Sequence, residues 1–173
     1  MLRPVLAWAA SMNLAAFGIT ADLPEGWEGR IVRRDTDLRL GPTQIAQFAP
    51  DEHTYPIAQF ANFALPPDVA DYGSGAVELM GRDNLFVTLL EFGPESVGQP
   101  LFAGEGLPLP LEVERFSPSQ LQRTIAGQGG FQTFFTASGR PFCLFIALGS
   151  YANRAVLVPR ADEVLASVEI EPR

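Results

Sequence analysis

Two segments of the chain are apolar at almost every position, and each has the length of a β-strand. From Phe142 to Gly149 the residues on both faces of an extended backbone are apolar, and the same holds for most of the segment from Asn84 to Phe92. A strand with two apolar faces belongs inside a sheet that is covered on both sides. The pattern therefore predicts a sheet with these two strands at its centre.

Neighbouring segments predict two hairpins. The segment Gly130–Thr136 precedes one central strand, and the intervening loop, residues 137–141, contains a glycine and has hairpin length. Near the start of the chain apolar and polar residues alternate from 17 to 23, and Pro24-Glu25-Gly26 is typical of a turn. We therefore expect residues 13–23 to form a strand that pairs with Trp27–Arg34.

The remaining segments complete a mixed fold. One more strand is predicted over Phe60–Leu65, and helices are predicted over Ser117–Thr124 and Arg160–Val168, with another short helix within residues 66–81. The segment Gly93–Pro110 is rich in glycine and proline, which predicts a long ordered loop. The expected fold class is α+β, with a twisted, mainly antiparallel sheet and a few short helices packed on it.

The first twelve residues bear on both domain organisation and compartment. They contain one arginine and a short apolar run, which is the minimum for a secretory signal and too short to span a membrane. The strand predicted directly afterwards argues against cleavage. A chain of 173 residues has the size of one domain. We expect residues 1–12 to be a leader or extension, residues 13–173 to be a single cytoplasmic domain, and secretion to be the alternative.

Composition excludes several classes of protein. The net charge is −8, so nucleic acid is a poor partner. The basic residues are arginines alone, and a chain without lysine has neither a Schiff-base lysine nor the lysine of a phosphate-binding P-loop. With one cysteine and one histidine, neither an internal disulfide nor a cysteine-rich metal site can form. No cofactor is predicted.

Two short motifs resemble the two ends of a known kind of domain. The opening FGITADLPEGW and the closing VLASVEI are similar to the first and last segments of PsbP-like α/β/α sandwich domains. The resemblance covers about 20 residues at the start and about 10 at the end of the predicted domain. It implies a twisted antiparallel sheet with helices packed on it. It implies no activity and assigns no functional residue.

Three side chains have reactive chemistry, and each also has a structural interpretation. Glu91 ends a strongly apolar strand, where it could act as a general acid or pair with an arginine, and we expect the pair. Cys143 stands among apolar residues and is expected to be a small buried side chain. His53 is expected in an exposed loop, since no second histidine or serine motif offers it a catalytic partner.

Two groups of residues are candidates for contact with a partner. Arg30 and Arg34 share one face of a predicted strand, where they would bind an anion or an acidic partner, or protect a solvated sheet edge. The glycine- and proline-rich loop carries a second group, whose apolar side chains would either bind a partner or cover the sheet: Leu101, Phe102, Leu107, Leu109 and Leu111.

The chain lacks a recognisable catalytic set, which favours a non-enzymatic function. We expect an interaction or accessory domain that binds a protein partner through the loop at 93–111. In one version of this hypothesis, the domain is part of a larger assembly. The alternative is a small hydrolase-like or ligand-binding protein that uses Glu91 and an arginine.

Overall fold

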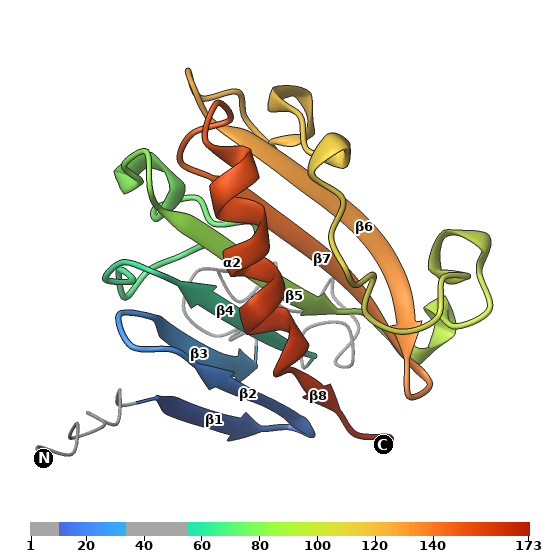
Figure 1. Cartoon of the computed structure of the whole chain (residues 1–173). Helices are drawn as coiled ribbons and strands as arrows, with labels where there is room; N and C mark the ends of the chain where they lie inside the picture. The colour runs from blue at the N-terminus through green and yellow to red at the C-terminus, as the bar shows by residue number, and fades with distance from the viewer. Residues whose placement is uncertain (1–10, 34–54) are drawn as a thin grey trace, which may run out of the picture.

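The computed structural model describes residues 11–33 and 55–173, which form two antiparallel β-sheets (Figure 1). The larger sheet has the strand order β3 (Glu28–Arg33), β4 (Pro56–Ala61), β5 (Leu85–Glu91), β7 (Arg140–Leu148) and β6 (Gly129–Ala137). The smaller sheet has the order β1 (Met12–Ala16), β2 (Ile19–Leu23) and β8 (Glu169–Ile170). The predicted α+β class with a mainly antiparallel sheet is confirmed.

The helical segments of the described chain are one α-helix and several single 3₁₀ turns. The α-helix is α2 (Arg154–Ala166), and the 3₁₀ turns are η1 (Val77–Leu79), η2 (Pro94–Ser96), η3 (Pro100–Phe102), η4 (Val113–Arg115) and η5 (Pro118–Gln120). Within the described residues no helix combines the length and the apolar character that crossing a membrane requires.

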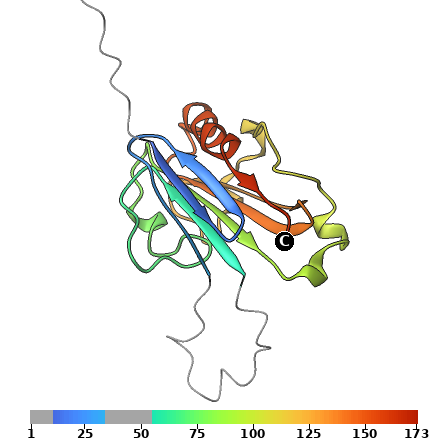
Figure 2. The same ribbon diagram turned by 90° about the horizontal axis from the view of Figure 1, so that it is seen from below.

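Both faces of the larger sheet are covered, as the two apolar strands predict. On one face Leu144 and Ile146 of β7 belong to the same core as Leu157 and Val164 of α2 and Ile19 of β2. The other face carries Phe86 and Phe145, which are covered by side chains from the irregular segment after β4. Figure 2 shows α2 and this segment on opposite sides of the sheet. The central positions of β5 and β7 are confirmed.

The predicted hairpin of β6 and β7 is also confirmed, with a tighter turn than expected. Ala137 pairs with Arg140, so that the connection consists of Ser138 and Gly139 alone. Both residues have positive φ, 51° and 71°, as a two-residue hairpin turn that follows the twist of its strands requires.

The opening of the chain differs from the prediction. Residues 13–23 do not form one strand, because the chain turns at Phe17 and Gly18 and β1 pairs with β2. After the predicted turn at residues 24–26, β3 pairs with β4 instead of β2. A Cβ on Gly29 would lie 2.8 Å from Leu14 Cδ1 and 2.6 Å from Leu23 Cδ1. The missing side chain lets the hairpin pack over β3, so the predicted pairing of residues 13–23 with Trp27–Arg34 is wrong.

One helix prediction and one strand boundary are also wrong, and the short helix expected within residues 66–81 is a single 3₁₀ turn. The segment predicted as the helix Ser117–Thr124 contains only η5, because Ser117 exchanges both backbone hydrogen bonds with Gly130 at the edge of β6 (2.9 and 3.0 Å). Residues 66–81 contain only η1. The strand expected over Phe60–Leu65 is β4, which overlaps that range only at its last two residues.

The final helix begins six residues before the predicted start at Arg160. Pro159 lies inside α2 and is exposed. Its missing N–H leaves the carbonyl of Ala155 without a helical partner, but Ala155 is also exposed, so water can satisfy that oxygen. The buried residues follow helical spacing on the opposite side, and they are Leu157, Val158, Ala161, Val164 and Leu165. The helix therefore tolerates Pro159 in its interior.

The predicted loop at 93–111 is ordered and wraps the edge of β6. Thr136 donates its N–H to Gly104 O and accepts from Gly106 N–H, each at 2.7 Å. On one face of the sheet Phe102 packs on the ring of Phe134, with centroids 5.5 Å apart. On the other face the leucines that follow in the loop pack against the main core.

Several predicted features lie outside the described residues. These are residues 1–10 of the expected leader, Arg34 of the predicted arginine pair, and His53. The described part begins with β1 at Met12, one residue before the predicted domain start. The leader and the exposed histidine stay predictions.

Candidate functional site

A buried ion pair joins the end of β5 to the start of β7. Glu91 lies opposite Phe142, which places Arg140 diagonally across the strand pair on the same face. Arg140 Nε donates to Glu91 Oε1 at 3.0 Å, and Arg140 Nη2 donates to Oε2 at 2.7 Å. Only 3% and 1% of the two side chains are exposed. The expected strand-end pair of Glu91 with an arginine is confirmed, and the arginine is Arg140.

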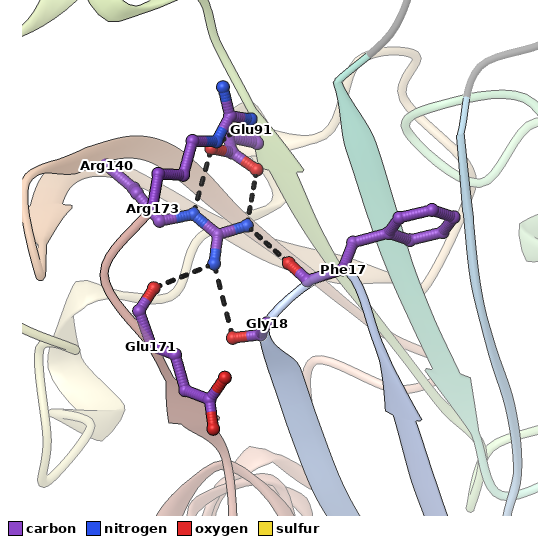
Figure 3. Close-up of polar contacts among 6 residues, drawn as sticks. All are labelled: Phe17, Gly18, Glu91, Arg140, Glu171 and Arg173. Atoms are coloured by element: carbon purple, nitrogen blue, oxygen red, sulfur yellow. Dashed lines mark hydrogen bonds and ion pairs between the residues drawn. The ribbon is translucent and has the colours of Figure 1, made fainter.

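The rest of the Arg140 guanidinium binds backbone carbonyls from two distant segments (Figure 3). Nη2 donates to Phe17 O at 2.9 Å, and Nη1 donates to Gly18 O at 3.2 Å and Glu171 O at 3.0 Å. All five N–H groups of this guanidinium are thus engaged. Gly18 is required here, because a Cβ would lie 2.9 Å from Nη1. Arg140 is a fixed internal clamp that has no donor left for a ligand.

Arg173 approaches the same carboxylate from the solvent side. Its Nη2 lies 2.7 Å from Glu91 Oε1, yet 48% of its side chain is exposed. Its guanidinium carbon lies 4.9 Å from the ring centroid of Tyr55. Figure 3 shows Arg173 in front of the Glu91–Arg140 pair. Arg173 therefore has one anchored edge and further donors that can reach a ligand.

A pocket opens beside this cluster, at the end of the sheets where the β1–β2 turn meets the C-terminal segment. Its volume is ≈ 430 Å³. The residues that line it are Phe17, Gly18, Arg33, Tyr55, Pro56, Arg140, Glu171, Pro172 and Arg173. Among the described residues the lining thus contains three arginines and one glutamate, and the Glu171 carboxylate points away from the Arg140 guanidinium in Figure 3. In a chain of net charge −8, this pocket is locally cationic.

Phe17 forms the rim of the pocket in an unusual backbone conformation. Its φ is 54°, in the left-handed region that bulky residues rarely adopt, and 43% of the residue is exposed. Asn, Asp and Gly are the usual residues at this position of a two-residue hairpin turn. The guanidinium carbon of Arg33 lies 4.8 Å from the centroid of its ring. The chain thus keeps an exposed aromatic ring in a strained position, directly under an exposed arginine.

Acid–base chemistry at Glu91 has little support in this geometry. Oε1 accepts from Arg140 and pairs with Arg173, and Oε2 accepts from Arg140. The carboxylate is buried behind its partners and does not line the pocket. The described residues also contain no group of histidine, cysteine and carboxylate side chains that could hold a metal ion.

Arg30, the described member of the predicted arginine pair, does not line the pocket. Arg30 donates through Nε to Gln59 Oε1 at 2.9 Å and through Nη1 to the carbonyls of Pro66 and Pro67, each at 3.1 Å. These bonds fasten β3 to the segment after β4. The predicted edge position is confirmed, because β3 is an outer strand of the larger sheet.

The predicted apolar loop is mostly turned inward. Phe102 and Leu111 are buried, and Leu107 and Leu109 are partly buried against the core. Leu101 is the exception, since 58% of it is exposed. The loop therefore covers the edge and both faces of the sheet at β6, which is the structural alternative considered for it.

Cys143 has the inert environment expected from its neighbours. It is fully buried in β7, and burial raises the pKa of its thiol to about 11. The neutral thiol is a poor nucleophile.

The sequence patterns did not identify the residues that build the pocket. Phe17 was placed inside a strand, and Arg140 and Arg173 were isolated arginines far apart along the chain. One usable signal was the Phe-Gly pair between two apolar alternations, since glycine with positive φ often marks a two-residue turn. None of the known protein-family models, curated proteins or solved structures compared with this chain matches it. The PsbP-like resemblance therefore stays a prediction.

Proposed function

We propose that this protein is a non-catalytic interaction domain that binds a protein partner at the pocket of Phe17, Arg33, Tyr55 and Arg173. The observation that carries the proposal is Phe17, a strained and exposed aromatic residue at the rim of a cationic pocket. Strained conformations persist where the surroundings enforce them, and they cluster at binding and catalytic sites. Aromatic residues and arginines are also the residues most enriched in interface hot spots.

Binding is favoured over catalysis by the kind of groups that the pocket presents. Its lining consists of arginines, aromatic rings, prolines, a glycine and Glu171. Neither a serine nor a cysteine nucleophile is among the lining residues that the structure describes. The alternative, a hydrolase-like protein using Glu91 and an arginine, requires Glu91 to exchange a proton with a substrate. Both of its oxygens are held by arginines instead.

The same pocket fits an accessory role within a larger assembly. It lies where the two sheets, the β1–β2 turn and the C-terminal segment meet, and Arg140 fixes these parts to one another. Its walls are thus held in place by a buried hydrogen-bond network. A preorganised site loses less conformational entropy on binding, which favours recognition of a specific partner.

The proposal is tested by comparing which proteins co-purify with three tagged versions of the chain from the cells that produce it. The versions are the wild type, the double variant R33Q/R173Q, and L101S. We expect partner proteins to co-purify in equal amounts with the wild type and with L101S. The same proteins should be lost from the double variant. L101S is the matched control, because Leu101 is the most exposed large apolar residue of the competing loop at 93–111.

The opposite pattern would reject the pocket as the binding surface. If the double variant kept these proteins and L101S lost them, the loop at 93–111 would be the contact surface. Thermal unfolding of all three versions is measured alongside. Both arginines and Leu101 are exposed, so we expect melting temperatures within a few degrees of each other.

A further inference from the structure

The inference concerns the chemistry of the partner, and it rests on the proposed function. Of the three arginines in the pocket, Arg140 is fully engaged, which leaves Arg33 and Arg173 to meet a ligand. Arginine presents its N–H donors in a planar fork that matches a carboxylate in two-point contacts. We infer that the pocket takes a carboxylate side chain from an acidic segment of the partner.

Arg33 and Arg173 are already oriented for this task. Arg33 lies over Phe17 and Arg173 lies over Tyr55, with 4.8 and 4.9 Å between guanidinium carbon and ring centroid. An aromatic ring beneath a guanidinium restricts the side chain and leaves the edge N–H groups available for an anion. Less rotamer entropy is then lost when a carboxylate binds.

Arg173 shows that a carboxylate is a suitable partner at this place. It already contacts Glu91 Oε1 at 2.7 Å, although that oxygen also accepts from Arg140. Besides its contact with Arg173, Glu91 accepts two bonds from Arg140, one at each oxygen. A carboxylate of the partner can therefore bind Arg173 while Glu91 and Arg140 remain hydrogen-bonded to each other.

The size of the pocket indicates a peptide segment and not a single small ion. A volume of ≈ 430 Å³ falls in the range of about 300–1,000 Å³ typical of sites for drug-sized ligands. An aspartate or glutamate together with its neighbouring residues fits this space. The exposed ring of Phe17 offers an apolar contact to those neighbours.

The test is calorimetric titration of the full chain with unlabelled heptapeptides blocked at both ends. The acidic probe is Gly-Ser-Glu-Asp-Glu-Ser-Gly, and its neutral match has Gln-Asn-Gln at the centre. We expect the acidic peptide to bind at least tenfold more tightly than the neutral one. R33Q and R173Q should each lower the affinity for the acidic peptide at least fivefold, since each removes one guanidinium group that would bind a carboxylate.

The matched control is R82Q, which removes the same charge from the opposite end of β5. Arg82 is 79% exposed and precedes the first residue of that strand, whereas Glu91 ends it. We expect R82Q to leave the affinity within twofold of the wild type. An equal loss in R82Q would show attraction to overall charge only, and equal affinity for both peptides would likewise overturn the inference.

A third probe carries phosphoserine in place of the central aspartate, between glutamines. If it alone bound, the site would recognise phosphate and the carboxylate assignment would be wrong. Failure of the acidic peptide, combined with loss of partners from R33Q/R173Q, would reject the inference and leave the proposed function standing. Retention of partners by that double variant would instead reject the proposed function.

Discussion

Arg140 joins parts of the chain that are more than 100 residues apart in sequence. Its guanidinium binds Glu91 on β5, the carbonyls of the β1–β2 turn, and the carbonyl of Glu171 after β8. A buried charge is costly unless it is paired and all its donors are satisfied. Because every donor of Arg140 has a partner, this residue can sit in the core and hold the walls of the pocket in place.

Replacing Glu91 by glutamine is expected to destabilise the fold strongly. E91Q leaves the buried guanidinium of Arg140 without its counter-charge, and breaking a buried pair on one side costs about 3–5 kcal/mol. In a domain of this size the melting temperature should fall by roughly 6–20 °C. R173Q is the control, because its partly exposed ion pair contributes about 0–1 kcal/mol. Equal melting temperatures for the two variants would contradict this account of the cluster.

The raised pKa of the Cys143 thiol predicts a specific dependence of the free energy of unfolding on pH. Burial raises the pKa of its thiol from an ordinary value of 9.0 to about 11. Between these values the unfolded chain releases the proton and the folded chain keeps it, so the free energy of unfolding falls as pH rises. The thiol's contribution is complete below pH 9 and decreases by about 2–3 kcal/mol by pH 11.

The measurement is urea unfolding of wild type and C143A at pH 8 and pH 10.5. Other groups also titrate in this range, so only the difference between the two proteins reports on the thiol. We expect the wild type to lose more stability than C143A over this interval. A parallel loss in both proteins would show that the thiol ionises as easily in the folded state as in the unfolded state.

At the scale of elements, β6 depends on the loop at 93–111. This strand is an outer strand of the larger sheet, and its backbone groups at Thr136 are paired with the loop through Gly104 and Gly106. Phe102 and the leucines that follow add side-chain contacts on both faces. Uncovered edge strands invite pairing with other chains, so this loop also protects the sheet from aggregation.

Two neighbouring positions separate the structural role of this loop from a binding role. Phe102 is buried and Leu101 is exposed. F102S should cost about 3–5 kcal/mol, as large-to-small changes of buried aromatic residues do, whereas L101S should change stability by less than about 0.5 kcal/mol. Urea unfolding monitored by circular dichroism measures both. A Phe102 variant as stable as the Leu101 variant would mean that the ring does not contribute to the core.

The elements that the sequence predicted well are those with an unambiguous pattern. Both faces of β5 and β7 are apolar at most positions, and the β6–β7 turn contains a glycine. Predictions failed where tertiary contacts decide the conformation. Ser117 is drawn into pairing with β6 in place of a helix, and Gly29 allows the first hairpin to lie over β3. Neither contact is visible in local propensity.

The sequence predicted less of the candidate site than of the fold. Glu91 was recognised as a strand-end acid that pairs with an arginine, but which of twelve arginines it meets depends on strand order. The pocket combines the β1–β2 turn, the ends of β3 and β4, and the C-terminal segment. Residues so far apart in sequence come together only through the topology, and periodicity carries no information about it.

At the scale of the whole molecule, the proposed binding of an acidic segment requires the pocket to be positively charged although the chain as a whole is negatively charged. The chain carries a net charge of −8, whereas the pocket is lined by three arginines and one glutamate. Over distances beyond about 8–10 Å, salt screens the interaction between exposed charges. At physiological salt an acidic segment therefore responds mainly to the arginines it touches, and the acidic remainder of the surface disfavours acidic segments that bind elsewhere.

The most direct test of the central claim is to replace Phe17 by asparagine and to measure both stability and affinity for the acidic heptapeptide. Asparagine followed by glycine is the preferred pair for this turn, so relief of the left-handed strain should stabilise the fold by about 0.5–1 kcal/mol. F17N also removes the ring beneath Arg33. The control is S138N, which places asparagine at the equivalent position of the β6–β7 turn, where φ is also positive. The account predicts that F17N gains stability and binds the peptide at least fivefold more weakly, while S138N binds it as the wild type does. Wild-type affinity in F17N would contradict the claim that the strained Phe17 serves binding.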